Sequence, residues 1–211
     1  GDPNNAIRIF NGKAADELIV LDIEASRASR GPNLEMIAQF AGECFMPVCY
    51  GGGIRTLDDA ARILELGVEK VSIQTAALSD YSLISAISSR FGSQAVVVSV
   101  DVRRARLGGD RLYASADQKA VKRSWQQWMA GAVDAGAGEV LLTSVDREGT
   151  LTGLDLDLIR EASSSVTVPL IANGGAGSLS DIRDGLAAGA SAVAAGAFFV
   201  FQGPHRAVLI T

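Results

Sequence analysis

Two long segments of this chain repeat one another at a constant spacing. The segment that begins at Pro47 aligns without a gap with the segment that begins 122 positions later at Pro169; they read PVCYGGGIRTLDDAARILELGVEKVSIQTAA and PLIANGGAGSLSDIRDGLAAGASAVAAGAFF. Further pairs keep the same register: Gly52 with Gly174, Gly53 with Gly175, Gly67 with Gly189, Val71 with Val193, and Glu17 with Glu139. A chance similarity would not keep the same spacing over so many predicted turns, so the chain consists of two copies of one β/α module.

Short apolar runs alternate with amphipathic segments along both copies. The runs predict parallel strands that are buried on both faces, at residues 17–22, 47–50, 70–74, 95–101, 139–143, 169–172 and 192–195. Two of the intervening segments, Leu57–Leu66 and Leu179–Ala188, have the helical period and follow the N-cap candidates Thr56 and Ser178. A polar stretch, Arg103–Lys119, breaks this rhythm and predicts a long loop or a hairpin.

This alternation predicts an α/β fold, namely a (βα)8 TIM barrel built from two half-barrel repeats. The 211 residues fit one barrel as a single domain, with repeat halves at about 1–93 and 94–211. The strand that ends at Asp101 has no counterpart 122 positions earlier, because that position would precede Gly1. The first strand of the barrel is therefore expected to be absent from this sequence, and an open sheet is the alternative.

Composition excludes several classes of protein. The chain has 19 basic and 24 acidic residues and a formal net charge of −5, which does not suit a nucleic-acid-binding surface. The longest small and apolar stretch, Gly189–Phe201, is shorter than the ~20 residues of a membrane span, and no signal peptide is visible. Cys44 and Cys49 make no disulfide framework, so a reducing cytoplasm is expected. A single histidine, His205, excludes a polyhistidine metal site, and neither a metal nor a cofactor is expected.

Glycines follow the predicted strands in both copies, at the end of a barrel where active sites form. Glycine lets the backbone approach a ligand closely, and free N–H groups favour a phosphate. One candidate phosphate cradle consists of Gly52, Gly53, Gln74 and Thr75, and the other of Gly174, Gly175, Gly196 and Ala197, with Asn173 beside it. Each loop alone could be a plain tight turn, but a facing pair of cradles suits a ligand with a phosphate at each end.

Carboxylates mark both ends of the predicted barrel. Asp101 ends an apolar strand and is a candidate general acid/base at the centre of the mouth, with a helix N-cap or an ion pair as the alternative. Asp22 and Glu148 are further candidates for catalysis or substrate binding, although Glu148 could also act only as a cap. At the opposite end, Glu17, Lys70 and Glu139 begin three strands and form either a charged ring or solvated strand starts.

Taken together, these residues resemble the cyclase (HisF-type) subunit of imidazole glycerol phosphate synthase. The resemblance extends from Gly1 to about Phe201 and is carried by DELIVLDIEAS, GGGIRTLDDAARIL, VEKVSIQTAAL, FGSQAVVVSVD, GAGEVLLTSVDREGT and NGGAGSLSDI. It implies an eightfold barrel that receives ammonia from a glutaminase (HisH-type) subunit docked at the N-terminal face. The ammonia would react with a ribonucleotide carrying two phosphates (PRFAR), giving imidazole glycerol phosphate and an aminoimidazole carboxamide ribotide (AICAR) for histidine biosynthesis.

The resemblance also implies roles for individual residues. Asp101 matches the second catalytic aspartate, whose partner belongs to the absent first strand, and Asp22 and Glu148 match acidic positions at the mouth. One phosphate site is matched by Gly53, Gln74 and Thr75, and the other by Gly149, Gly174, Gly175, Ala195 and Gly196. The ammonia gate is matched by Glu17, Lys70 and Glu139, and a fourth gate residue, an arginine, would lie upstream of Gly1.

Departures from the family pattern concentrate around the two cradles. The family usually has Asp at Glu148, Asn at Gln74 and Ser at Asn173 and Gly196, and Thr at Cys49. Two segments, RGPNLEMIAQFAGECFMPVCYGGGI and GAFFVFQGPHRAVLI, are similar to a paralogous branch that passes ammonia to acetamidino-sugar formation in O-antigen (lipopolysaccharide) biosynthesis. Two further alternatives are a phosphoribosyl isomerase of the sister family and a non-catalytic scaffold that only channels ammonia.

Overall fold

The computed structural model describes residues 3–12, 15–105, 109–202 and 207–208. In chain order its elements are α1 (Pro3–Gly12), β1 (Leu18–Leu21), α2 (Ile23–Arg27), α3 (Leu34–Glu43), β2 (Val48–Gly51), α4 (Leu57–Glu65), β3 (Lys70–Ile73), the 3-10 turn η1 (Thr75–Ala77), α5 (Ser82–Phe91), η2 (Ser93–Ala95), β4 (Val96–Arg104), β5 (Asp110–Ala114), β6 (Lys119–Ala120), α6 (Trp125–Asp134), β7 (Glu139–Ser144), α7 (Leu156–Ser163), β8 (Leu170–Asn173), α8 (Leu179–Ala187), β9 (Ala192–Ala194), α9 (Ala197–Val200), β10 (Phe201–Gln202) and β11 (Ala207–Val208). The predicted alternation of strands and helices is confirmed.

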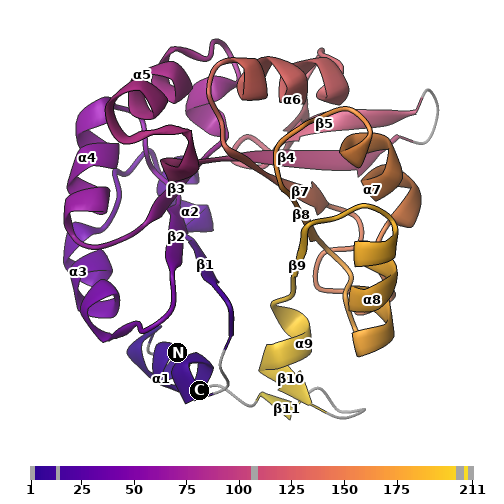
Figure 1. Cartoon of the computed structure of the whole chain (residues 1–211), viewed down its shortest axis with the longest axis horizontal. Helices are drawn as coiled ribbons and strands as arrows, with labels where there is room; N and C mark the ends of the chain where they lie inside the picture. The colour runs from indigo at the N-terminus through magenta and orange to yellow at the C-terminus, as the bar shows by residue number, and fades with distance from the viewer. Residues whose placement is uncertain (1–2, 13–14, 106–108, 203–206, 209–211) are drawn as a thin grey trace.

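The parallel strands curve into a nearly closed barrel with helices around it (Figure 1). The strand order is β1-β2-β3-β4-β7-β8-β9, and every neighbouring pair along this path is parallel. Within the described part of the chain β1 and β9 do not pair with each other, and Figure 1 shows the ring open between them. The prediction of an α/β barrel is therefore confirmed, with its opening at the position that the repeat assigns to the first strand.

The repeat in the sequence is also a repeat in the structure. Every residue of β2 and α4 has its counterpart in β8 and α8 at the spacing of 122. The predicted N-caps are confirmed, because the side chains of Thr56 and Ser178 each accept a hydrogen bond from a backbone N–H at 3.1 Å. Gly67 and Gly189 end the equivalent turns with φ of 99° and 112°, a conformation that glycine adopts without strain.

Two apolar layers hold the strands in place. The larger layer lies between the strands and the helices, where Trp125 and Trp128 of α6 are 1% and 0% exposed. A smaller cluster fills the inside of the ring and consists of Cys49, Val97, Leu141 and Ile171, with Ile19 and Ala194 packed against it. Because side chains alternate along each strand, the residues two positions further along also point inward, which brings their chemistry to the mouth of the barrel.

The polar stretch after Asp101 forms a hairpin. Strand β4 was expected to end at Asp101 but continues to Arg104, because Val102–Arg104 pairs with β5 in the antiparallel sense. Strand β5 pairs in turn with β6. The hairpin therefore carries residues 110–116 back across the mouth, and this positions the side chains described next.

Candidate functional site

One cavity of about 330 Å³ opens at the carboxyl ends of the strands. Its lining includes most of the mouth residues that the sequence predicts: Asp22, Gly52, Gly53, Gln74, Thr75, Asp101, Glu148 and Asn173. These residues come from both halves of the repeat and are separated by up to 151 positions, from Asp22 to Asn173. The fold therefore collects them at one site.

Asp101, on β4, lies in the wall of this cavity. Its carboxylate accepts a hydrogen bond from the hydroxyl of Ser115. Burial raises the pKa of Asp101 above its ordinary value, and hydrogen bonds from Ser115, Gln74 and Thr143 oppose that shift. A carboxyl group with a raised pKa keeps its proton to a higher pH, which suits it to exchange protons with a ligand.

Ser115 is a site residue that sequence reasoning missed. It follows β5, and its backbone N–H donates to Gln74 Oε1 at 3.3 Å while its hydroxyl reaches Asp101. The amide of Gln74 also donates to the carbonyl oxygen of Tyr113 at 3.3 Å. The predicted phosphate ligand Gln74 is thus engaged with the hairpin, and its side chain positions Ser115 against the carboxylate.

Glu148, which follows β7, and Asn173, at the end of β8, line the same cavity as Asp101. Burial raises the pKa of Glu148, the charge of Asp101 adds to this shift, and a hydrogen bond from Asn173 opposes it. The amide of Asn173 also donates to the hydroxyl of Thr143 at 3.2 Å. Two carboxyl groups with raised pKa values therefore share the cavity, an arrangement typical of proton transfer.

Asp22 has a structural role in addition to its place in the lining. Its carboxylate caps α2 by accepting from the backbone N–H groups of Glu24 and Ala25 at 3.2 and 3.0 Å. Arg30 lies 3.6 Å from its other oxygen. Both oxygens have partners, so Asp22 is less available to a ligand than Asp101.

The two glycine pairs adopt the backbone that the cradle hypothesis requires. Gly52, Gly53, Gly174 and Gly175 all have positive φ, between 72° and 123°. A Cβ on Gly52 would lie 2.4 Å from the carbonyl oxygen of Asp22, and one on Gly174 would lie 2.6 Å from that of Ser144. No residue with a side chain fits at either place, so glycine is required by contact as well as by φ.

The second cradle is much tighter than the first. It is a separate cavity of about 10 Å³, to which Glu148 and Asn173 also contribute. Its lining includes the remaining predicted phosphate ligands: Gly149, Gly174, Gly175, Ala195 and Gly196, together with Ala197. The two cradles therefore lie on either side of Glu148 and Asn173, which line both cavities.

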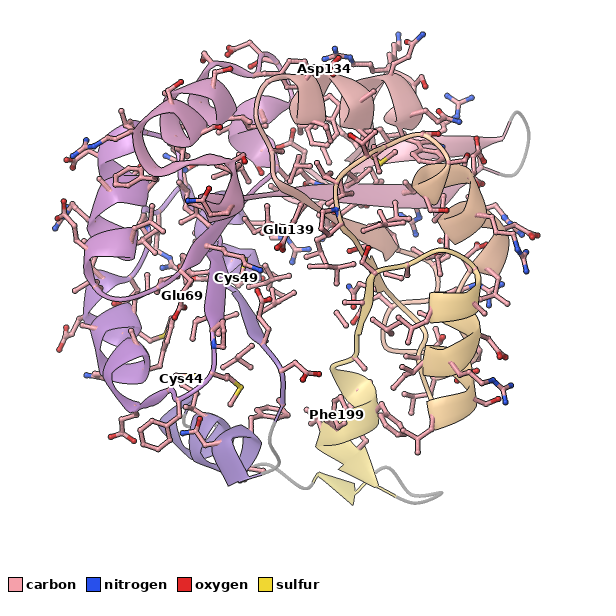
Figure 2. The ribbon with its side chains drawn as sticks, in the orientation of Figure 1. Cys44, Cys49, Glu69, Asp134, Glu139 and Phe199 are labelled. Atoms are coloured by element: carbon pink, nitrogen blue, oxygen red, sulfur yellow. The ribbon has the colours of Figure 1, made fainter. Side chains whose placement is uncertain are left out.

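At the opposite end of the strands, three charged side chains converge. Lys70 Nζ lies 2.9 Å from a Glu17 oxygen and 2.7 Å from a Glu139 oxygen, from three different strand starts. Burial lowers the pKa of Lys70, but its hydrogen bonds and ion pairs with Glu139 and Glu17 outweigh this and raise it, so Lys70 is charged. Figure 2 shows Glu139 and Cys49 inside the ring of strands. The interpretation as solvated strand starts is wrong: these residues form a partly buried ion-pair cluster.

The second carboxylate oxygens of this cluster find no hydrogen-bond partner within the part of the chain that the structure describes. Glu17 Oε1 and Glu139 Oε2 are buried without a hydrogen bond among the described residues. Cys49 lies beside them, and burial followed by the charge of Glu17 raises the pKa of its thiol. The thiol is therefore neutral, and the cluster lies directly below the apolar layer inside the barrel.

Neither a metal site nor a membrane segment emerges from the described residues. They contain no group of three or more His, Cys, Asp or Glu side chains arranged to hold a metal ion. None of their helices has the length and apolar character that crossing a bilayer requires. His205 lies outside the described residues.

The half-barrel repeat, with carboxylates and paired glycines at the carboxyl ends of its strands, defines an α/β-barrel protein whose candidate site lies at that end. Comparison with known proteins gives the family. The profile of the family described as "Histidine biosynthesis protein" matches residues 1–204. The chain therefore belongs to the histidine biosynthesis protein family, and the resemblance to its HisF-type members is confirmed.

Two relatives illustrate this membership. The chain is 55% identical over 212 residues to a Pseudomonas aeruginosa protein named "Putative imidazole glycerol phosphate synthase subunit hisF2", covering 100% of this chain and 84% of the relative. It is 43% identical over 204 residues to the imidazole glycerol phosphate synthase subunit HisF of Hyphomonas neptunium, covering 95% of this chain and 80% of that protein.

Proposed function

We propose that this protein is the ammonia-using synthase subunit of a glutamine amidotransferase pair, and that it converts a bis-phosphorylated ribonucleotide (PRFAR) to imidazole glycerol phosphate and AICAR. The observation that carries this proposal is the place of Asp101, half-buried in the wall of a cavity that has one glycine cradle in its lining and the other next to it. Relatives named as HisF subunits of imidazole glycerol phosphate synthase support the same activity.

The proposed chemistry needs proton transfer at one place. Ammonia adds to a carbonyl or imine carbon of the substrate, and ring closure then eliminates the second product. Asp101 donates and accepts the protons, since its raised pKa lets it keep its proton to a higher pH than an ordinary aspartate. Glu148 assists from the loop that follows β7, in the same cavity. A phosphate in each cradle holds the substrate across the two carboxyl groups.

Ammonia is proposed to enter at the Lys70 cluster. In this proposal a glutaminase subunit docks on the face that bears Glu17, Glu69, Lys70 and Glu139. Residues 1–211 act as a single barrel domain, and the complex is located in the cytoplasm. Supporting this route, the cluster and Asp101 lie at opposite ends of the same inward-facing strand surfaces. Opening Lys70 away from the two glutamates would let a small neutral molecule pass.

A second candidate is the O-antigen branch, in which ammonia is used for acetamidino-sugar formation. Gln74 and Asn173 favour it, because both amides already bond to the protein, Gln74 to the hairpin and Asn173 to Thr143. These positions depart from the family pattern, and their engagement points to a changed ligand.

The decisive assay supplies ammonium salt and PRFAR to the purified protein and measures imidazole glycerol phosphate. Turnover supports the cyclase proposal, and its absence with an intact far-UV spectrum favours the O-antigen branch. Lys70→Ala distinguishes the cyclase from the sister isomerase, because an isomerase needs no ammonia gate and its turnover would stay unchanged. Asp101→Asn distinguishes the cyclase from a non-catalytic scaffold, because a scaffold would keep transferring ammonia in the reconstituted pair.

A further inference from the structure

Arg27 projects into the wall of the cavity from the end of α2. Among the described residues that line this cavity it is the one cationic side chain, whereas three carboxylates line it: Asp22, Asp101 and Glu148. The Arg27 side chain is 35% exposed and its guanidinium lies 3.1 Å from Glu24 Oε1. An anion entering this cavity therefore meets net negative charge unless Arg27 turns towards it.

Two neutral groups of the first cradle, the Gly53 N–H and the Gln74 amide, are already engaged. The backbone N–H of Gly53 donates to Ser26 Oγ at 3.3 Å, so it is not free for a phosphate oxygen. The Gln74 amide is held by the hairpin at Tyr113 and Ser115. Ser26 is the neighbour of Arg27 and also lines the cavity. The strongest remaining donor at this cradle is therefore the guanidinium of Arg27.

Arg27 is held in place relative to the glycines. The segment that carries it packs directly on the cradle, because a Cβ on Gly53 would lie 2.8 Å from the carbonyl oxygen of Arg30 and 3.1 Å from the Cβ of Ala25. Arg30, the neighbouring cation, pairs with Asp22 at 3.6 Å and is not part of the lining. The two arginines are thus separated in function: one stabilises the loop and the other faces the cavity.

We propose that Arg27 is the cationic arm of the first cradle and that it exchanges the Glu24 carboxylate for a phosphate group of the ligand. This inference rests on the proposed function, whose substrate it describes further: the ligand end at Gly52 and Gly53 is a phosphate monoester or diphosphate. The exchange is easy because an exposed (i, i+3) ion pair contributes little, whereas a guanidinium binds phosphate through two parallel hydrogen bonds.

The proposal makes the two cradles unequal. The described residues that line the second cradle include the carboxylate of Glu148 and no cationic side chain. Binding at the first cradle should therefore weaken more steeply with added salt than binding at the second, because a side-chain charge is screened by ions.

The test is a titration of the protein with ribose 5-phosphate, followed through the backbone amide signals of Gly53 and Gly175 in 15N-resolved NMR spectra. Each signal reports the Kd of its own cradle. We expect Arg27→Ala to raise the Kd at Gly53 about fivefold and to leave the Kd at Gly175 unchanged. Arg27→Lys should restore part of the affinity, and Glu24→Gln should lower the Kd at Gly53 about twofold, because it releases the guanidinium. Ribose serves as the uncharged probe, and Arg62→Ala, an exposed arginine on α4, as the matched control.

Three results would overturn the proposal. One is an unchanged Kd at Gly53 in Arg27→Ala, the second is an equal loss at both glycines, and the third is no saturable shift at Gly53 in the wild-type protein. Turnover of PRFAR is measured separately. Binding at Gly53 that depends on Arg27, without turnover, would overturn the cyclase reaction and leave the role of Arg27 intact.

Discussion

The two glycine cradles share one backbone and differ in what surrounds it. In both, two glycines have positive φ, and the first of them lies against the carbonyl oxygen of an equivalent residue, Asp22 or Ser144, which are 122 positions apart. The first cradle opens into a cavity of about 330 Å³ with Arg27 in its wall, and the second encloses only about 10 Å³. The two repeats therefore share the contacts that fix the path of the backbone, whereas the side chains around the two cradles differ.

The largest expected effect comes from removing the carboxylate that is proposed to transfer protons, Asp101 in the wall of the first cavity. Asp101→Asn should lower kcat for the ammonium-dependent reaction by about 10²–10⁴-fold, the usual contribution of a positioned acid/base. Phosphate binding at either cradle should persist, since no cradle glycine moves. Steady-state kinetics with ammonium salt measures the loss, and a variant within threefold of wild type would remove Asp101 from the mechanism.

Alanine substitutions at the equivalent glycines compare the two backbones directly. A Cβ on Gly175 would lie 2.3 Å from the carbonyl oxygen of Gly153, whereas one on Gly53 would lie 2.8 Å from that of Arg30. We expect Gly175→Ala to lower the free energy of unfolding by about 3 kcal/mol and Gly53→Ala by about 2 kcal/mol, from strained φ plus steric overlap. Urea denaturation gives both values, and the reverse order would show that the first cradle is the more rigid.

The charge of Asp101 should also make stability depend on pH. Its pKa is raised in the folded state, so its contribution to stability is full below the ordinary value of 3.8 and is lost as pH rises through the folded value. Asp101→Asn has no such loss. The variant should therefore be more stable than wild type at pH 7, and the difference should shrink as pH falls towards 4. Thermal unfolding across this range tests the sign, and a difference that grows at low pH would contradict it.

A smaller effect is expected where the hairpin is tied to the loop that follows β7. Asp146 accepts from Arg103 Nε at 3.2 Å and from the backbone N–H of Arg104 at 2.8 Å. Both side chains are largely exposed, so Asp146→Ala should lower the free energy of unfolding by only about 0.5–1 kcal/mol. Arg160→Ala, which removes another exposed ion pair, is the control, because that pair lies within a single helix. If the contacts of Asp146 with the hairpin also position Ser115, Asp146→Ala should lower kcat more than Arg160→Ala does. Equal effects on kcat in the two variants would show that these contacts do not position Ser115.

The sequence predicts the barrel well because its signal is local and repeated. The apolar runs and the caps Thr56 and Ser178 can be recognised from short stretches of sequence, and the spacing of 122 residues shows that they are repeated. The cradle glycines were predicted because they come directly after the strands. Ser115 was missed because its contact with Asp101 depends on the antiparallel pairing of β4 with β5, and no residue spacing in the sequence predicts this pairing. Arg27 was missed because a helical arginine is usually solvated, and only the packing of its segment on Gly53 directs it to the cavity.

The central claim is that one ligand spans both cradles with Asp101 between its ends. A crystal structure of the protein with PRFAR bound, in the absence of ammonia, tests it most directly. The account predicts one phosphate against Gly52, Gly53 and Arg27, the other against Gly174, Gly175 and Gly196, and the reacting carbons within reach of Asp101. Both phosphates on one side of the mouth, or a ligand that leaves Asp101 facing solvent, would contradict it.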